Sequence, residues 1–232
     1  MAASPPRLRV DLLGTPRLSA GERVTTRFET RRTALLLARL ALPPLREWSR
    51  DELIELLWPD EDPVLTRTRL RQTLASLRRA LEEVGTADEE VVLRASRASV
   101  ALDVEQVASD VVELEACLRQ ASATPEQRRE ALDRALKLYE NHLMPGFYET
   151  WVLSERERIE GRMRTALLQL TQSLHESEPD AAITYARTAV NLDPLDETAQ
   201  ENLLKLLIQT GRNTEALRHW KDVERLFWKE LR

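Results

Sequence analysis

A set of arginine, threonine and glutamine side chains within residues 64–83 has the types and spacing that suit recognition of a nucleic acid. Leu70, Leu74, Leu77 and Leu81 recur every three or four residues and form the apolar stripe of a helix. On the other sides of that helix we place Thr68, Arg69, Arg71, Gln72, Ser76 and Arg79. Arginine can pair with guanine and glutamine with adenine, while small hydroxyls reach phosphate or base edges. We predict that this helix enters a major groove, with a merely solvated amphipathic face as the alternative.

The neighbouring segments are those needed to position such a helix. Ser49, followed three residues later by Glu52, is a capping box and predicts a helix that ends before Pro59. Two short alternating runs at 91–94 and 99–102 predict a β-hairpin after the long helix. Helix, turn, longer helix and hairpin in this order are typical of a winged helix-turn-helix. Its second helix reads bases, and its wing touches the DNA backbone or the minor groove.

Further candidate DNA contacts lie at the ends of these elements. Ser49 and Arg50 begin the first helix of the motif, where a helix N-terminus could hold a phosphate. Ser49 could equally be a plain structural cap. The hairpin contributes Arg94 and Arg97, and an earlier helix at 29–42 begins with Arg31 and Arg32.

The remaining chain divides into a mixed first part and a helical second part. Residues 7–14, 16–20 and 22–28 read as three short strands. From Asp103, an expected helix N-cap, the pattern predicts helices at 104–121, 125–142, 148–176, 179–191, 196–210 and 213–231. The predicted fold class is α+β and mainly α. A winged helix-turn-helix with a small β-sheet occupies 1–102, and an all-α, TPR-like helical domain occupies 103–232.

An internal repeat supports the TPR-like reading. Ala182, Ala186 and Ala189, followed by Pro194, have the small-residue and proline spacing of one TPR unit. One period of about 34 residues later, the matching positions hold Ala216, Trp220 and Val223. Two generic helical hairpins remain the alternative.

Three tryptophans of the second part, Trp151, Trp220 and Trp228, are expected to pack between helices. A groove lined by them that binds a peptide or a small molecule is the alternative.

Composition bounds the protein class. The chain of 232 residues is 42% hydrophobic and 31% charged, as a soluble globular protein is. It has no apolar run near the ~18 residues of a membrane span, no signal peptide and one cysteine, Cys117. We therefore expect a cytoplasmic protein with no membrane partner.

Charge is distributed unevenly, because the net charge of −5 coexists with 17 arginines against 15 acidic residues in the first hundred positions. Local basic surface can bind DNA despite a net negative charge, because screening acts over about 8 Å. Codon bias in a GC-rich genome is the alternative explanation for the arginines.

Other chemistry has little support in the sequence. His142, His175 and His219 are scattered and lack metal-ligand spacing, and no phosphate-binding glycine loop is present. No nucleophile, base and orienting group can be assembled from the sequence. We expect neither an enzyme nor a metal or cofactor site.

Two motif blocks carry a family resemblance. RRTALLLARLAL, SRDELIELLWPD and RTRLRQTLASLRRAL resemble the OmpR-like DNA-binding domain of SARP-type (AfsR-like) regulators. Downstream, ALKLYENHLMPGFYETWVLSERERI and AITYARTAVNLDPLDETAQENLLKLLIQTGRNTEALRHW resemble the bacterial transcriptional activator domain. The resemblance implies that 64–83 is a recognition helix and that the protein binds direct repeats near promoters as a homodimer. It also implies recruitment of RNA polymerase through the sigma or alpha subunit, and a nucleoid location when bound to DNA.

A rival function of another class is a TPR-type adaptor. In that reading the helical part binds a partner protein, and the winged helix serves as a second protein-binding module that does not read DNA.

Overall fold

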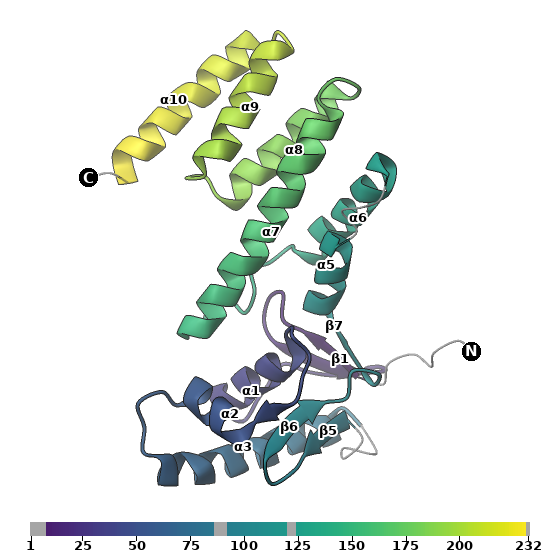
Figure 1. The fold of residues 1–232 in the computed structure, drawn as a ribbon, viewed down its shortest axis with the longest axis vertical. Coiled ribbons are helices and arrows are strands. Elements are labelled where there is room, and N and C mark those ends of the chain that lie inside the picture. The colour runs from purple at the N-terminus through teal and green to yellow at the C-terminus, as the bar shows by residue number, and fades with distance from the viewer. Residues whose placement is uncertain (1–7, 86–91, 120–123, 231–232) are drawn as a thin grey trace. The chain divides into compact units, whose positions relative to one another are not determined.

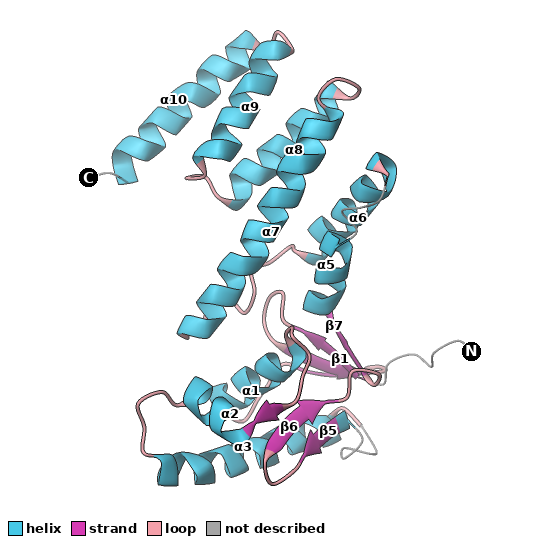
Figure 2. Ribbon diagram, viewed as in Figure 1, coloured by secondary structure: helices cyan, strands magenta, loops and turns pink. Residues whose placement is uncertain are grey.

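The computed structural model describes residues 8–85, 92–119 and 124–230, traced by position in Figure 1 and by secondary structure in Figure 2. The chain forms two compact units. The first unit comprises Met1–Ala116 and Ala135–Leu153, and the second comprises Cys117–Arg134 and Ser154–Arg232. Most of the residues predicted to bind DNA belong to the first unit's winged helix, and the repeat belongs to the second unit.

The first unit opens with a small sheet. The three short strands that the sequence predicts are present as β1 (Leu8–Asp11), β2 (Arg17–Ala20) and β3 (Arg23–Thr25). They form an antiparallel meander. A fourth strand, β7 (Val107–Ser109), pairs in parallel with β1, so the order is β3-β2-β1-β7. The expectation of a purely helical pattern from Asp103 onward is therefore wrong at these residues. A three-residue strand is too short to show alternation, and its partner lies about a hundred positions away in the sequence.

Two helices form the hydrophobic centre of the first unit. Helix α1 (Arg31–Ala41) begins at Thr30, whose hydroxyl accepts the Thr33 amide, and its side chains from 33 to 41 are all buried. Helix α3 (Pro63–Glu83) buries the predicted leucine stripe, whose four members are at most 3% exposed. Gly85, with a left-handed φ of +86°, ends α3. The predicted apolar stripe of the long helix is therefore confirmed.

Helix α2 (Arg50–Leu57) begins at the predicted capping box. The Ser49 hydroxyl accepts the Glu52 amide at 3.1 Å, and the Ser49 amide donates to the Glu52 carboxylate at 2.9 Å. The predicted hairpin is also present as β5 (Leu93–Ala95) and β6 (Ser99–Leu102). It extends to the short strand β4 (Trp48–Ser49), giving the order β4-β6-β5. Val91, expected in the hairpin, lies outside the described residues.

Segments beyond the wing return to the first unit. Helix α5 (Asp110–Arg119) begins directly after β7. Helices α6 (Pro125–Leu138) and α7 (Thr150–Leu174) each begin or end within the first unit's share of the chain. Between them, the Gly14 amide donates to the His142 carbonyl at 3.0 Å and the Met144 amide donates to the Leu12 carbonyl at 2.9 Å. The boundary expected at Asp103 thus falls inside the first unit.

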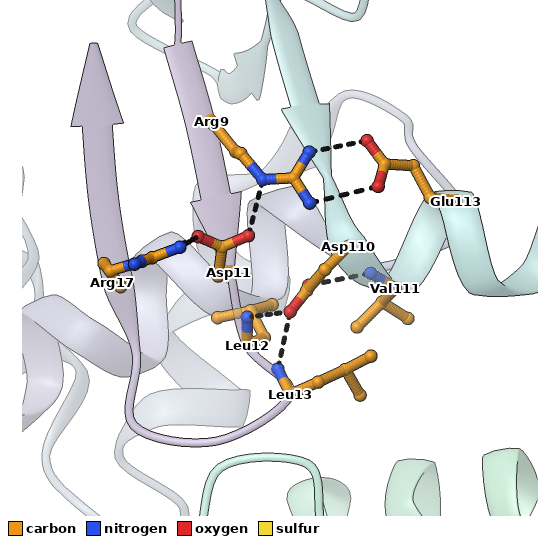
Figure 3. A network of polar contacts seen from close by, with 8 residues as sticks. All are labelled: Arg9, Asp11, Leu12, Leu13, Arg17, Asp110, Val111 and Glu113. Carbon is orange, nitrogen blue, oxygen red and sulfur yellow. Dashed lines mark hydrogen bonds and ion pairs between the residues drawn. The ribbon is translucent and has the colours of Figure 1, made fainter. Parts of the chain in front are cut away.

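A buried carboxylate, Asp110, joins the end of β1 to the start of α5 (Figure 3). One oxygen accepts the amides of Leu12 and Leu13 at 2.8 and 2.7 Å, and the other accepts the amide of Val111. Burial raises the pKa of Asp110 to about 6, although these backbone hydrogen bonds act in the opposite direction. Beside it, Arg9 makes two bonds to Glu113, at 2.7 and 3.0 Å.

In the second unit, helices α8 (Pro179–Leu192), α9 (Glu197–Gln209) and α10 (Asn213–Glu230) follow one another as helical hairpins (Figure 1). Ala182, Ala186 and Ala189 are completely buried, so small residues lie where the helices pack, as the repeat predicts. Gly211, with a φ of +74°, ends α9 and begins the turn to α10. The predicted helix ends at 120–121 and 231 lie outside the described residues.

Two tryptophans depart from the expected packing between helices. Trp220 and Trp228 are 56% and 64% exposed on α10, so the packing prediction is wrong for both. Trp151 is half-buried in the first unit, over the buried guanidinium of Arg39. No helix in the described part of the chain is both long and apolar enough to span a bilayer.

Candidate nucleic-acid interface

The first helix of the motif, the long helix and the hairpin tip enclose an open hollow of about 960 Å³, which we call the wing-side hollow. Its lining includes four arginines, Arg50, Arg67, Arg71 and Arg97, against one carboxylate, Asp51. Ser49 also lines it. The structure therefore brings together residues from α2, α3 and the β5–β6 hairpin that the sequence predicted separately. A concave surface with this excess of guanidinium groups suits a phosphate-bearing ligand.

Hydrogen bonds from Arg50, the first residue of α2, hold the tip of the hairpin in position. The backbone amide of Arg50 donates to the Ala98 carbonyl at 2.9 Å, and its side-chain Nε donates to the Ser96 carbonyl at 3.0 Å. Ser96 in turn closes the tip, because its hydroxyl accepts the amides of Ala98 and Ser99. Arg50 thus has a structural role in addition to its predicted contact with phosphate.

The remaining arginines of this hollow carry uncompensated charge. Within the described residues, Arg67, Arg71 and Arg97 have no carboxylate partner, and Arg71 Nε donates to the Arg67 carbonyl at 3.4 Å. Their positive charge is therefore available to an anion without the loss of an existing ion pair.

A second hollow of about 450 Å³, the α1-side hollow, lies on the other flank of α3. Its lining includes five predicted contact residues, Arg32, Arg69, Gln72, Ser76 and Arg79. Arg32 pairs with the partly buried carboxylate of Glu149 at 3.9 Å. Two further arginines are paired at exposed positions, Arg69 with Glu61 and Arg79 with Glu29 at 2.9 Å. These exposed pairs are weak enough for a phosphate to displace the carboxylate.

The outward side of α3 lies between the two hollows. The side chains of Thr68, Arg71 and Ala75 are exposed there. Thr73, Ser76 and Ala80 are buried as well as the leucines. At about 100° of rotation per residue around the helix axis, the centre of the whole buried side therefore lies roughly 50° from the centre of the leucine stripe. The exposed side is therefore centred closer to Arg71 than the leucine stripe alone predicts. Arg69 and Gln72 lie on the flank of α3 that faces α1.

Ser76 is the predicted contact that the structure contradicts. Its side chain is only 5% exposed and accepts a hydrogen bond of 3.0 Å from the Thr33 hydroxyl of α1. The apolar pattern alone could not show this, since the contact between α1 and α3 uses small polar side chains at this point. In this position the Ser76 hydroxyl is bonded to α1 and is not free to extend from the outward side of α3.

Arg31 and Arg94 are held by neighbouring groups. Arg31 binds both oxygens of Glu149 and the Gly146 carbonyl, and its guanidinium lies 4.2 Å from the centre of the Phe147 ring. We therefore assign Arg31 a structural role. Arg94 pairs with Asp103 at 2.6 Å, remains largely exposed and lines neither hollow.

Sequence reasoning missed Arg67. The helix wheel places it within about 40° of the centre of the leucine stripe, which argued for burial. In the structure its side chain is exposed, although the neighbouring Thr66 is completely buried, and the leucine stripe begins only at Leu70. A signal was available, since the apolar repeat has no member before Leu70 on that side.

Across the residues that the structure describes, no three His, Cys, Asp or Glu side chains cluster in a way that could hold a metal ion.

Comparison with known families and proteins agrees with this architecture. The family described as bacterial transcriptional activator domain matches residues 102–232, more than half of the chain. The regulatory protein AfsR of Streptomyces coelicolor is 28% identical over 235 residues, and that of Streptomyces griseus is 25% identical over 229 residues. Each alignment covers 97% of this chain but only 22% and 23% of the relatives, so the chain spans under a quarter of their length.

A solved structure shares the fold. The Mycobacterium tuberculosis EmbR structure, determined in complex with a low-affinity phosphopeptide, superposes with a TM-score of 0.75 at 21% identity. The match covers 97% of this chain and 61% of the other. The family match begins at residue 102, close to the expected boundary at Asp103, although the first compact unit extends past it.

Proposed function

Because the chain belongs to the bacterial transcriptional activator domain family and is SARP-like over nearly its whole length, we propose that it regulates transcription by binding specific DNA sites through α3 and the β5–β6 hairpin. In this proposal α3 lies in the major groove, and Thr68, Arg71 and Gln72 reach base edges. The hairpin tip, with Arg97, contacts the backbone or the minor groove.

The observation that carries the proposal is the arrangement of arginines in two hollows on opposite flanks of α3. A helix in the major groove has one phosphate backbone on each side of it. The wing-side hollow offers Arg67, Arg71 and Arg97 to one strand, and the α1-side hollow offers Arg32 and Arg79 to the other. An adaptor that bound protein instead would have no need of guanidinium groups on both flanks.

We further propose that the protein acts as an activator. It would bind direct repeats near promoters as a homodimer and recruit RNA polymerase through the sigma or alpha subunit. Family membership supports this activity. Light scattering with and without a two-repeat DNA tests the dimer, and one protomer per two-repeat site would contradict it.

The decisive experiment is selection of bound fragments from a genomic DNA library, followed by titration of the enriched site. We expect nanomolar affinity that falls steeply with salt, because phosphate contacts release counterions. Arg71→Ala should weaken specific binding by about ten- to a hundredfold, while Arg218→Ala on α10 serves as a matched arginine control. Equal binding by wild type and Arg71→Ala, or no enriched sequence at low salt, would favour the adaptor.

A further inference from the structure

An apolar groove lies between α9 and α10 in the second unit, remote from the proposed DNA interface in the sequence. It has a volume of about 480 Å³, and its floor is formed by Leu204, Trp220, Val223, Phe227 and Trp228. The lining comes from residues 197–204 of α9 and residues 220–228 of α10, so the groove lies away from the Gly211 turn that joins the two helices.

The tryptophan side chains of the groove are not buried in the core of the second unit. Trp220 and Trp228 keep more than half of their surface in contact with solvent. Exposed aromatic side chains that gather around an apolar hollow are the usual anchors of a protein interface.

The rim of the groove has one sign of charge. Three glutamates, Glu197, Glu201 and Glu224, border the floor, and none of the basic residues that the structure describes lines it. Glu201 pairs with Lys205 one helical turn along, at 2.7 Å. Within the described residues, Glu197 and Glu224 have no ion-pair partner, so their charges face solvent uncompensated.

An apolar floor between acidic rims fits one class of occupant. We propose that this groove binds an amphipathic helix of a partner protein, whose apolar face covers Trp220 and Trp228 and whose lysines or arginines meet Glu197 and Glu224. Apolar area supplies the affinity and the opposite charges set the orientation. A second copy of this chain fits less well, because a two-fold axis through the groove would bring identical carboxylates face to face.

The test uses the full chain and two labelled peptides of about 14 residues, or four helical turns. One peptide combines a leucine face with lysine flanks, and the other carries glutamate at every lysine position. Fluorescence anisotropy measures binding of each. We expect the lysine peptide to bind at least tenfold more tightly than the glutamate peptide, and the tryptophan emission to shift to shorter wavelength as the peptide covers the indoles.

Matched variants separate the groove from the general acidity of the protein. Trp228→Ala should weaken binding of the lysine peptide by about tenfold, and Ile208→Ala, an exposed apolar residue of α9 outside the groove, should leave it unchanged. The double change Glu197→Gln and Glu224→Gln should weaken binding and reduce its salt dependence, whereas Glu176→Gln, a highly exposed carboxylate elsewhere in the unit, should do neither.

Three results would overturn the proposal. The first is equal binding of both peptides, which would indicate an apolar site without charge selection. The second is binding that survives Trp228→Ala. The third is a dimer in light scattering that Trp228→Ala dissociates while neither peptide binds, which would make a second copy the occupant.

Discussion

Arg50 at the start of α2 donates from Nε to the carbonyl oxygen of Ser96 at the tip of the β5–β6 hairpin, at 3.0 Å. Together with the amide bond to Ala98, this contact ties the wing to the helix that supports α3. The two protein surfaces expected to contact DNA are therefore positioned by one residue. Loss of its side chain would change the geometry of both.

We predict that Arg50→Ala weakens specific DNA binding by about tenfold and loosens the wing. Amide hydrogen exchange at Ser99 and Val100 should become faster, because the tip loses its side-chain anchor. A residue that only contacted phosphate would lower the affinity and the salt slope while leaving hydrogen exchange in the wing unchanged.

Glu61→Gln should strengthen DNA binding. In the free protein Glu61 neutralises Arg69 across an exposed contact. The amide removes this competition, so we expect a two- to fivefold gain in affinity (about 0.4–1 kcal/mol) at low salt, the usual size for an exposed pair. Titration at several salt concentrations tests it, with Glu55→Gln on α2 as the control. Weaker binding by Glu61→Gln would show that Glu61 positions Arg69 for contact.

Ser76→Ala should cost stability without changing DNA recognition. The hydroxyl accepts a buried bond from Thr33, and loss of such a bond costs about 1 kcal/mol. Thr33→Val should cost more, about 1–3 kcal/mol, because it leaves the Ser76 hydroxyl buried and unsatisfied. Thermal unfolding and DNA titration of the same samples separate the two effects. A large loss of affinity in a fully folded Ser76→Ala protein would return this residue to the interface.

Asp110 should make the first unit less stable as the pH rises from about 4 to about 6. Burial raises the pKa of Asp110 to about 6, above its ordinary value, so in this window the folded state holds the proton more firmly than the unfolded state. The free energy of unfolding of the wild type, minus that of Asp110→Asn, should fall by at most about 3 kcal/mol over this window. Urea unfolding of both proteins between pH 4 and 7 measures it. A difference that rises with pH would mean that the three amide bonds dominate over burial.

The sequence predicted those parts of the fold whose signals are local. The capping box at Ser49 and the leucine stripe from Leu70 to Leu81 each lie within a few turns of chain, and both appear as expected. The strand at 107–109 was not predicted. It forms by pairing with the edge of β1, and the sequence does not show that these distant segments lie side by side.

The candidate site shows the same division. Exposure of Arg71 and Gln72 follows from the apolar stripe, but burial of Ser76 requires knowing that α1 crosses α3 at that point. The ion pairs of Arg69 with Glu61 and of Arg79 with Glu29 could not be predicted from the sequence either, because both glutamates lie on other segments that fold against the helix.

The parallel pairing of β7 with β1, together with the return of residues 135–153, limits how this protein can be cut and recombined. A fragment truncated at Leu102 would expose one edge of the meander and leave the amides of Leu12 and Leu13 without their carboxylate. An exposed strand edge of this kind favours pairing between copies of the fragment. Chimeras that fuse the first unit to another domain should therefore carry the chain through Leu153, so that the transferred piece keeps β7 and residues 135–153 with β1.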